Sequence, residues 1–316
     1  MFEPTEREFD DDVQRSMNMF ERARVGDVPA VEPLIPQRLL LALDGSSQDA
    51  MGQRIAQQVR RRFDGDLTVV DGRESEESDT LMEQVAEDLN ARALPKLSGE
   101  NYEQILAAID QSKCDLLIVP CPFERDFAKV GTDSIGTVID VLVSRSSVPL
   151  LVVRESYEIS AEPFSRVSMV LVGENEAAQL AARWATGLVA AGGTLELTLL
   201  LETEIFENVR DLIRALDPAV DVSQEKLAEA MQRSRVRLHR ALQKAAREAG
   251  FQYRLNMRQD GDDSPIESRT GERHPLTVLA LENSDHLSQG FVHDRIRQSP
   301  GALLVVPQQT KKPEHD

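Results

Sequence analysis

The sequence predicts an α/β protein with two doubly wound parallel five-stranded sheets in tandem. From residue 37 onward, short runs of consecutive apolar residues alternate with amphipathic helical stretches. Consecutive apolar residues are typical of strands covered on both faces, as in a parallel sheet flanked by helices. After residue 163 the same order of strands and helices starts again, which indicates an internal repeat. A chain of 316 residues is long enough to form two cores.

The composition excludes several classes of protein. Acidic residues outnumber basic ones by 54 to 36, and the resulting net charge of −18 opposes binding to nucleic-acid phosphates. The amino terminus is acidic where a signal peptide needs bases and an apolar core. No apolar run approaches the ~18–20 residues of a membrane span. We therefore expect a cytoplasmic protein with no nucleic-acid partner and no membrane insertion.

The chain has two cysteines, Cys114 and Cys121, one before a predicted strand and one just after it. No second cysteine pair completes a metal site. In a cytosolic protein we expect both to be reduced, packed thiols, and a redox sensor is the alternative.

Residues 1–36 are predicted to form an acidic extension rather than a domain. Phe9, Val13, Met17 and Phe20 recur on one face of a short charged helix, and three prolines then interrupt regular structure. This helix either docks on its own chain or serves as an arm for a protein partner.

Residues 37–155 are predicted to form the first domain, with five strands and four helices in alternation. The strands are expected at Arg38–Asp44, Asp66–Asp71, Ala91–Leu97, Asp115–Pro120 and Val148–Val153. Pro95 cannot donate a ladder hydrogen bond, so the third strand is expected at a sheet edge. The last helix, entered at Thr132–Thr137, carries its apolar residues at helical spacing (Ile135, Val138, Ile139 and Leu142).

Residues 163–308 are predicted to form a second, divergent domain, followed by a polar tail at residues 309–316. Its strands are expected in RVSMVLVG, TLELTLLLE, FQYRLNM, PLTVLALE and GALLVVP, with FQYRLNM at the edge. An added helical segment over residues 205–216 and a longer helix ending at Gly250 separate the second and third strands. A polar loop stands where the third helix is expected.

Four stretches of the first domain, taken in order, resemble the universal stress protein family: RLLLALDGSSQDA, DLTVVD, YEQILAAIDQSKCDLLIVP and GTVIDVLVSRSSVPLLVV. The second domain resembles it mainly in element order and length. The resemblance implies the family's adenine-nucleotide-hydrolase-like fold. It also implies pairing through last strands, here Val148–Val153 with Leu303–Val306, as an intramolecular pseudo-dimer, with a homodimer as a further option.

The resemblance also implies a candidate site for ATP or AMP. Family members that bind ATP carry Gly-x2-Gly-x9-Gly-Ser/Thr after the fourth strand, where glycines let the backbone approach phosphates. Gly136 and Thr137 match its end, whereas the earlier glycine positions fall on Phe123 and Asp126. Asp44 matches the family's acid near the nucleoside. Because prolines and acids also enter this loop, we expect a degenerate phosphate loop.

Each candidate residue also has a purely structural interpretation. Asp44 is equally well explained as a turn acid that caps the next helix, and the Gly136–Thr137 pair as close packing plus a helix-terminal hydroxyl. The second domain keeps one glycine, Gly290, in the corresponding loop, and we expect no nucleotide there.

Other motifs in the sequence give weaker evidence of function. The Gly-x4-Gly pattern that ends at Gly136 lacks the lysine of a P-loop. His286 and His293 share a helix face but have no third metal ligand, so we expect surface residues and no metal site. No catalytic nucleophile signature stands out.

The hypothesis is therefore a non-enzymatic cytoplasmic protein of the universal stress type, with a stress-response and regulatory role exerted through binding. Three alternatives stay open. One is an ATP- or AMP-binding sensor that uses the first domain, and another is a slow ATP hydrolase. The third is an adaptor or regulatory partner of a kinase or a transporter that uses residues 1–36.

Overall fold

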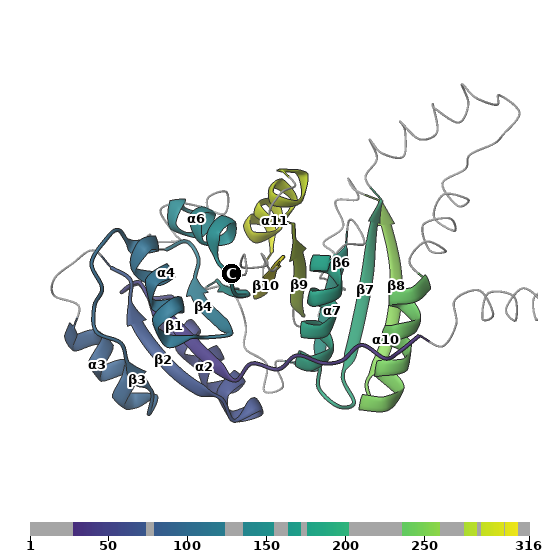
Figure 1. Cartoon of the computed structure of the whole chain (residues 1–316), viewed down its shortest axis with the longest axis horizontal. Coiled ribbons are helices and arrows are strands. Elements are labelled where there is room, and N and C mark those ends of the chain that lie inside the picture. The colour runs from purple at the N-terminus through teal and green to yellow at the C-terminus, as the bar shows by residue number, and fades with distance from the viewer. Residues whose placement is uncertain are drawn as a thin grey trace, which may run out of the picture.

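Ten strands form one sheet in the order β3-β2-β1-β4-β5-β10-β9-β6-β7-β8 (Figure 1). The structure, a computed structural model, describes residues 28–73, 79–123, 135–154, 164–171, 176–201, 236–259, 275–282, 286–299 and 301–308. The predicted amino-terminal helix, the helical segment over 205–216, the polar loop before residue 275 and the tail at 309–316 lie outside these ranges. None of the described helices is both long and apolar enough to cross a membrane.

The first half alternates strands and helices as predicted. Its elements are β1 (Arg38–Leu43), α2 (Asp49–Phe63), β2 (Asp66–Asp71), α3 (Asp79–Asp88), β3 (Arg92–Ala93), α4 (Asn101–Ser112), β4 (Leu116–Pro120), α6 (Thr137–Arg145) and β5 (Leu150–Val153). The third strand, predicted over Ala91–Leu97, is only Arg92–Ala93 and ends before Pro95, so the predicted length is wrong. It lies at the sheet edge, which confirms the predicted position.

The second half repeats this order. Its described elements are β6 (Arg166–Leu171), α7 (Glu176–Leu188), β7 (Thr194–Leu201), α10 (Val236–Ala249), β8 (Gln252–Gln259), β9 (Leu276–Leu281), α11 (His286–Gln298) and β10 (Leu303–Pro307). The predicted edge strand FQYRLNM is β8, which forms the other end of the sheet.

The strand order shows the repeat directly. Within the first half the order is β3-β2-β1-β4-β5, and within the second it is β8-β7-β6-β9-β10, the same plan with every pairing parallel. The halves meet where β5 and β10 pair antiparallel, with Leu304 opposite Leu151. The two five-stranded parallel units are therefore joined into one mixed sheet, and neither last strand is left as an open edge.

Helices cover both faces of the central strands, which explains why these strands are apolar at successive positions. Leu39, Leu41 and Leu43 face the core under α2, α3, α7 and α10, whereas Leu40 and Ala42 face the core under α4, α6 and α11. Both cores run through both halves of the chain. The two units thus share their hydrophobic interior.

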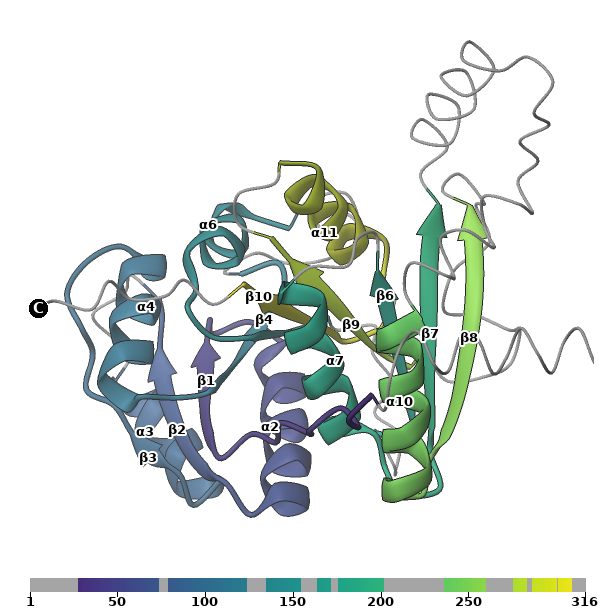
Figure 2. The same ribbon diagram turned by 45° about the vertical axis from the view of Figure 1, so that its right-hand side comes forward.

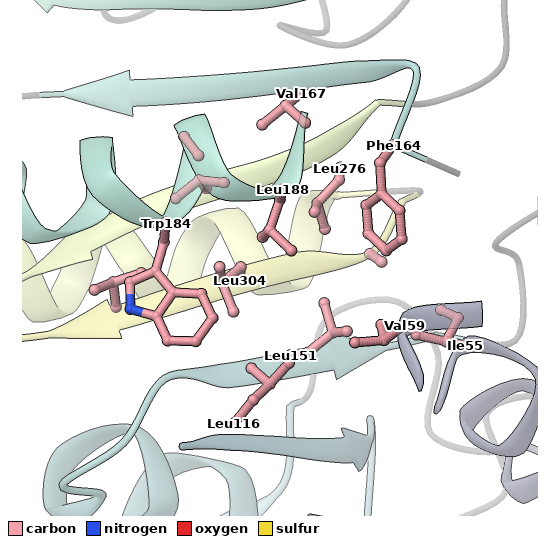
Figure 3. Close-up of a cluster of buried hydrophobic side chains, with 14 of the residues drawn as sticks. Ile55, Val59, Leu116, Leu151, Phe164, Val167, Trp184, Leu188, Leu276 and Leu304 are labelled. Atoms are coloured by element: carbon pink, nitrogen blue, oxygen red, sulfur yellow. The ribbon is translucent and has the colours of Figure 1, made fainter. Parts of the chain in front are cut away.

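The contact between the halves is apolar and partly aromatic. Figure 3 shows side chains of α2, including Ile55 and Val59, on the same side of the sheet as Phe164 and Trp184 of the second half. Phe63, at the end of α2, lies 6.0 Å from Phe164 between ring centroids. Such a continuous core favours one cooperative unit rather than two independent ones.

Residues 28–36, which we call the crossing segment, connect the halves a second time. This segment (purple) runs across α7 and α10 before entering β1 (Figures 1 and 2). The Val31 amide donates to the Ala241 carbonyl at 3.3 Å, and the Leu34 amide donates to the Arg183 carbonyl at 2.9 Å. The described part of the predicted amino-terminal extension is thus packed on the second half.

Gly187 of α7 permits this close approach. A Cβ atom at Gly187 would lie 1.8 Å from the Leu34 carbonyl oxygen, far inside van der Waals contact. Arg183 of α7 also binds the crossing segment, since its Nε donates to the Glu32 carbonyl at 3.2 Å. The helix surface is therefore shaped to receive the backbone of the crossing segment.

Candidate functional site

The candidate site lies at the carboxyl ends of β1, β2 and β4, where ligands of doubly wound sheets bind. Asp44 follows β1 directly and is 4% exposed. Its Oδ1 accepts a hydrogen bond from the Ser46 amide at 2.8 Å, which closes a local turn. This bond stabilises a turn, as in the structural interpretation of Asp44. It does not cap α2, because Ser46 lies three residues before that helix.

A second carboxylate, Asp49, occupies the same turn. Its two oxygens accept hydrogen bonds from the Asp44 amide at 3.0 Å and the Gly45 amide at 2.8 Å. Burial of Asp49, together with the charge of Asp44, raises the pKa of the Asp49 carboxyl to about 7. Three successive backbone donors at the end of β1 are thus bound to the chain's own acids.

Gln48 links the turn that follows β1 (the β1 turn) to the turn that follows β4 (the β4 turn). Its Nε2 donates to the Pro122 carbonyl at 3.0 Å, and the side chain is 1% exposed. The Oε1 atom is buried and has no hydrogen-bond partner in the described part of the chain. An acceptor of this kind carries a desolvation cost unless a donor reaches it.

Phe123 fills the space beside the end of β4. It stands at one of the two positions where the family pattern has glycine, and it is 3% exposed. A Cβ atom on Gly72, just after β2, would lie 2.8 Å from the Phe123 ring. The aromatic ring therefore takes up room that a glycine would have left to a ligand.

Gly136 and Thr137 begin α6 on the other side of this turn. Gly136 is the residue before the helix and has a φ of 81°, a conformation that favours glycine. An added Cβ would lie 3.9 Å from both the Phe123 amide and the Pro122 Cβ, so Gly136 packs beside the β4 turn. Thr137 is exposed. Asp126, the other position without glycine, lies outside the described residues.

The structure therefore brings Asp44 and Gly136 to one end of the sheet, linked through Gln48 and Pro122. A cation is also present, because Arg73 pairs with the fully buried Asp71 at 2.8 Å. The Arg73 side chain lies over the β1 turn, where a Cβ on Gly45 would meet its Cδ at 2.7 Å.

Sequence reasoning missed Asp49 and Gln48. Asp49 lies in the first turn of α2, where an acid is ordinary because it complements the helix dipole. The available signal was the spacing in DGSSQD, where a second acid follows Asp44 by five residues and begins the next helix, α2.

The sequence also singled out two histidines, two cysteines and Gly290. His293 Nδ1 lies 3.3 Å from Asp140 Oδ1, an ion pair between α11 and α6 when the imidazole is protonated. No group of three metal-ligating side chains occurs among the described residues. Cys114 and Cys121 are free and buried, and burial raises the pKa of each thiol to about 11. Gly290 has open space around it.

Three solved structures share this architecture. A universal stress protein from Archaeoglobus fulgidus DSM 4304 matches with a TM-score of 0.59 and 14% identity, over 86% of this chain and 96% of that one. A protein of unknown function from Pseudomonas aeruginosa PAO1 matches with a TM-score of 0.56 and 14% identity, over 87% and 93%. A candidate universal stress protein from Pseudomonas aeruginosa UCBPP-PA14 gives 0.56 and 13%, over 87% and 94%.

No protein-family model matches the sequence, and no curated protein matches it. At identities near 14% the structural likeness defines the fold and nothing narrower. The chain has the universal stress protein fold, repeated in tandem within one sheet. The resemblance stated from the sequence is confirmed at this level.

Proposed function

We propose that this chain is a cytoplasmic regulatory protein of the universal stress type that acts by binding and catalyses no reaction, and that its degenerate phosphate loop does not hold a triphosphate. One observation carries the proposal. The amides of Asp44, Gly45 and Ser46, in the turn that forms part of the candidate site, are already hydrogen-bonded to Asp44 and Asp49.

Charge supports the same conclusion. A bound triphosphate needs N–H donors and cations, whereas this turn presents two carboxyl groups and a cation already paired with Asp71. Two unit charges of the same sign 4 Å apart repel by about 4 kcal/mol at an effective dielectric constant of 20. A triphosphate near the Asp44 carboxylate would therefore lose much of its binding energy. Phe123 removes space as well.

Isothermal titration calorimetry with ATP tests the proposal. We expect ATP to bind the wild-type chain more weakly than the millimolar range at pH 7.5. The paired substitutions Asp49→Asn and Phe123→Gly remove a charge and a ring from the turn, so a gain in ATP affinity in the double variant would support the proposal. Submillimolar binding of ATP to the wild-type chain would contradict it.

A sensor for AMP or another adenine compound is the second candidate, and Gln48 favours it. Its buried Oε1 lacks a partner in the described part of the chain and lies between the ends of β1 and β4. An N–H group of a nucleobase would satisfy this acceptor. Titration with AMP and adenosine tests the sensor: submillimolar binding that Gln48→Met and Asp44→Ala both weaken would support it, and absence of binding would exclude it.

Slow ATP hydrolysis has a separate control. Hydrolysis at this site predicts phosphate release that Asp44→Ala abolishes. Equal release by the wild-type chain and the variant would place the activity in a contaminant and leave the non-enzymatic proposal intact.

An adaptor role, with a kinase or a transporter as partner, would use the amino-terminal extension. Since residues 28–36 pack on α7 and α10, the cleaner truncation removes residues 1–27 only and keeps the crossing segment. A pull-down that loses its partner on this truncation would support the adaptor role. A pull-down that is unchanged would remove the extension from it.

A further inference from the structure

A polar cavity of about 280 Å³ lies in the first half, at the amino-terminal ends of β1, β2 and β3. Arg38, Asp66 and Arg92 are the first residues of these three strands, and all three line the cavity. Because the strands are parallel, their amino-terminal ends lie side by side at one end of the strands. The candidate site lies at the opposite, carboxyl ends of the strands, so the cavity is a second site, separate from it.

The charge of the lining residues differs from that of the chain. Three arginines, Arg38, Arg60 and Arg92, and one acid, Asp66, contribute to the described lining. The chain as a whole carries a net charge of −18. A local excess of guanidinium groups in such an acidic protein attracts small anions to this point.

One of the three arginines has a structural task. Arg60 Nη1 donates to the Leu89 carbonyl at 2.6 Å and to the Asn90 carbonyl at 2.8 Å. These bonds satisfy two backbone carbonyls in the turn that follows α3, and they fix the Arg60 guanidinium in place at the cavity. The helix-end carbonyls thus account for Arg60.

The other two arginines are not explained in this way, because they begin strands rather than end helices. The nearest acid to Arg38 is Asp115, at 4.0 Å, and the Arg38 side chain is 53% exposed. Asp115 is itself engaged by the Gln37 and Arg38 amides. Arg92 makes no ion pair or side-chain hydrogen bond with any described residue. Both guanidinium groups therefore remain available to a ligand.

We propose that this cavity binds a phosphate group, either inorganic phosphate or a phosphate monoester. Guanidinium groups bind phosphate oxygens in bidentate geometry. Arg38 and Arg92 supply two such groups to the lining of a space large enough for a small tetrahedral anion, and Arg60 adds a third positive charge. Thr68 and Asn90 add neutral hydrogen-bonding groups to the lining. Asp66 opposes the anion, and its carboxylate limits the site to ligands that engage at least two arginines.

Calorimetry on the full-length chain tests the site with two probes, inorganic phosphate and glycerol phosphate, at matched ionic strength with chloride. We expect submillimolar binding of one or both. Arg38→Gln and Arg92→Gln should each weaken it roughly tenfold, since each removes a charge-assisted hydrogen bond. Both side chains are exposed, so neither change disturbs the core.

Two controls distinguish a built site from general electrostatics. Arg61→Gln makes the same charge change on the exposed end of α2, outside the cavity, and should leave phosphate affinity unchanged. Arg145→Gln, at the exposed end of α6 and also outside the cavity, should leave it unchanged as well. Preference for glycerol phosphate would identify a monoester as ligand, and preference for the inorganic ion would identify free phosphate. Absence of binding by the wild-type chain, or equal weakening by Arg61→Gln, would overturn the proposal.

Discussion

Replacing Gly187 by alanine tests whether the crossing segment holds the two halves together. In most helices a glycine-to-alanine change stabilises by about 1 kcal/mol, because glycine has the greater backbone entropy in the unfolded chain. At Gly187 the added methyl group would lie 1.8 Å from the Leu34 carbonyl oxygen. The backbone of the crossing segment must therefore move away from α7.

The cost can be worked out from the contacts that this movement breaks. Two hydrogen bonds are lost, from the Leu34 amide to the Arg183 carbonyl and from Arg183 Nε to the Glu32 carbonyl, at about 1 kcal/mol each. Partial exposure of Leu34, which packs against the core, adds about 1 kcal/mol. After subtracting up to about 1 kcal/mol of helix propensity, we expect a net destabilisation of about 2 kcal/mol.

Urea unfolding followed by tryptophan emission measures this difference, because Trp184 is the chain's one tryptophan and is 5% exposed. Gly290→Ala is the matched control. Gly290 lies in α11 with nothing within 4 Å of an added Cβ, so the same change there should stabilise by about 1 kcal/mol. If Gly187→Ala proved as stable as Gly290→Ala, the packing of the crossing segment on α7 would be refuted.

Three further predictions concern buried polar groups. The pKa of Asp49 is about 7 in the fold and 3.8 in the unfolded chain, so the native state binds more protons between these values. Wild-type stability should therefore fall as pH rises from about 4 to 7, relative to Asp49→Asn, and parallel pH curves would contradict this. Thr198→Val should stabilise by about 1 kcal/mol in urea unfolding, because the buried Thr198 hydroxyl has no hydrogen-bond partner among the described residues; a loss of stability would indicate a hidden partner. Cys114 and Cys121 should resist a thiol reagent at pH 8 until the chain unfolds, and fast labelling of the native chain would show that the thiols are accessible.

The element order of the fold could be predicted because the central strands are covered on both faces. Consecutive apolar residues in Arg38–Leu43 and Leu150–Val153 indicate such strands without any knowledge of their partners. Pro95 likewise predicted an edge position for the third strand from its missing donor alone. These signals are local, so the sequence carries them in full.

The crossing segment could not be predicted, since its contacts use backbone atoms. The amides of Val31 and Leu34 bond to helix carbonyls, and any residue except proline supplies such a donor. The complementary feature is the missing side chain of Gly187, which in a helix looks like an ordinary weak position. Pairing of β5 with β10 was implied only by the family resemblance, because both strands are equally apolar.

The candidate site was predicted in part. Asp44 and Gly136 do lie at one end of the sheet, and the loss of glycine at Phe123 was visible in the spacing. The sequence did not reveal that Phe123 packs over Gly72, nor that Asp49 takes the amides of the β1 turn. Both depend on the direction of a side chain in a turn, which residue spacing does not determine.

A crystal structure obtained with ATP tests most directly the claim that the degenerate phosphate loop does not hold a triphosphate. We predict that Phe123 stays over Gly72, that Asp49 keeps its bonds to the β1 turn, and that the electron density contains no ordered triphosphate. An ordered triphosphate seated against Gly136 and Thr137, with its oxygens on the amides of the turn, would contradict the proposed loss of triphosphate binding.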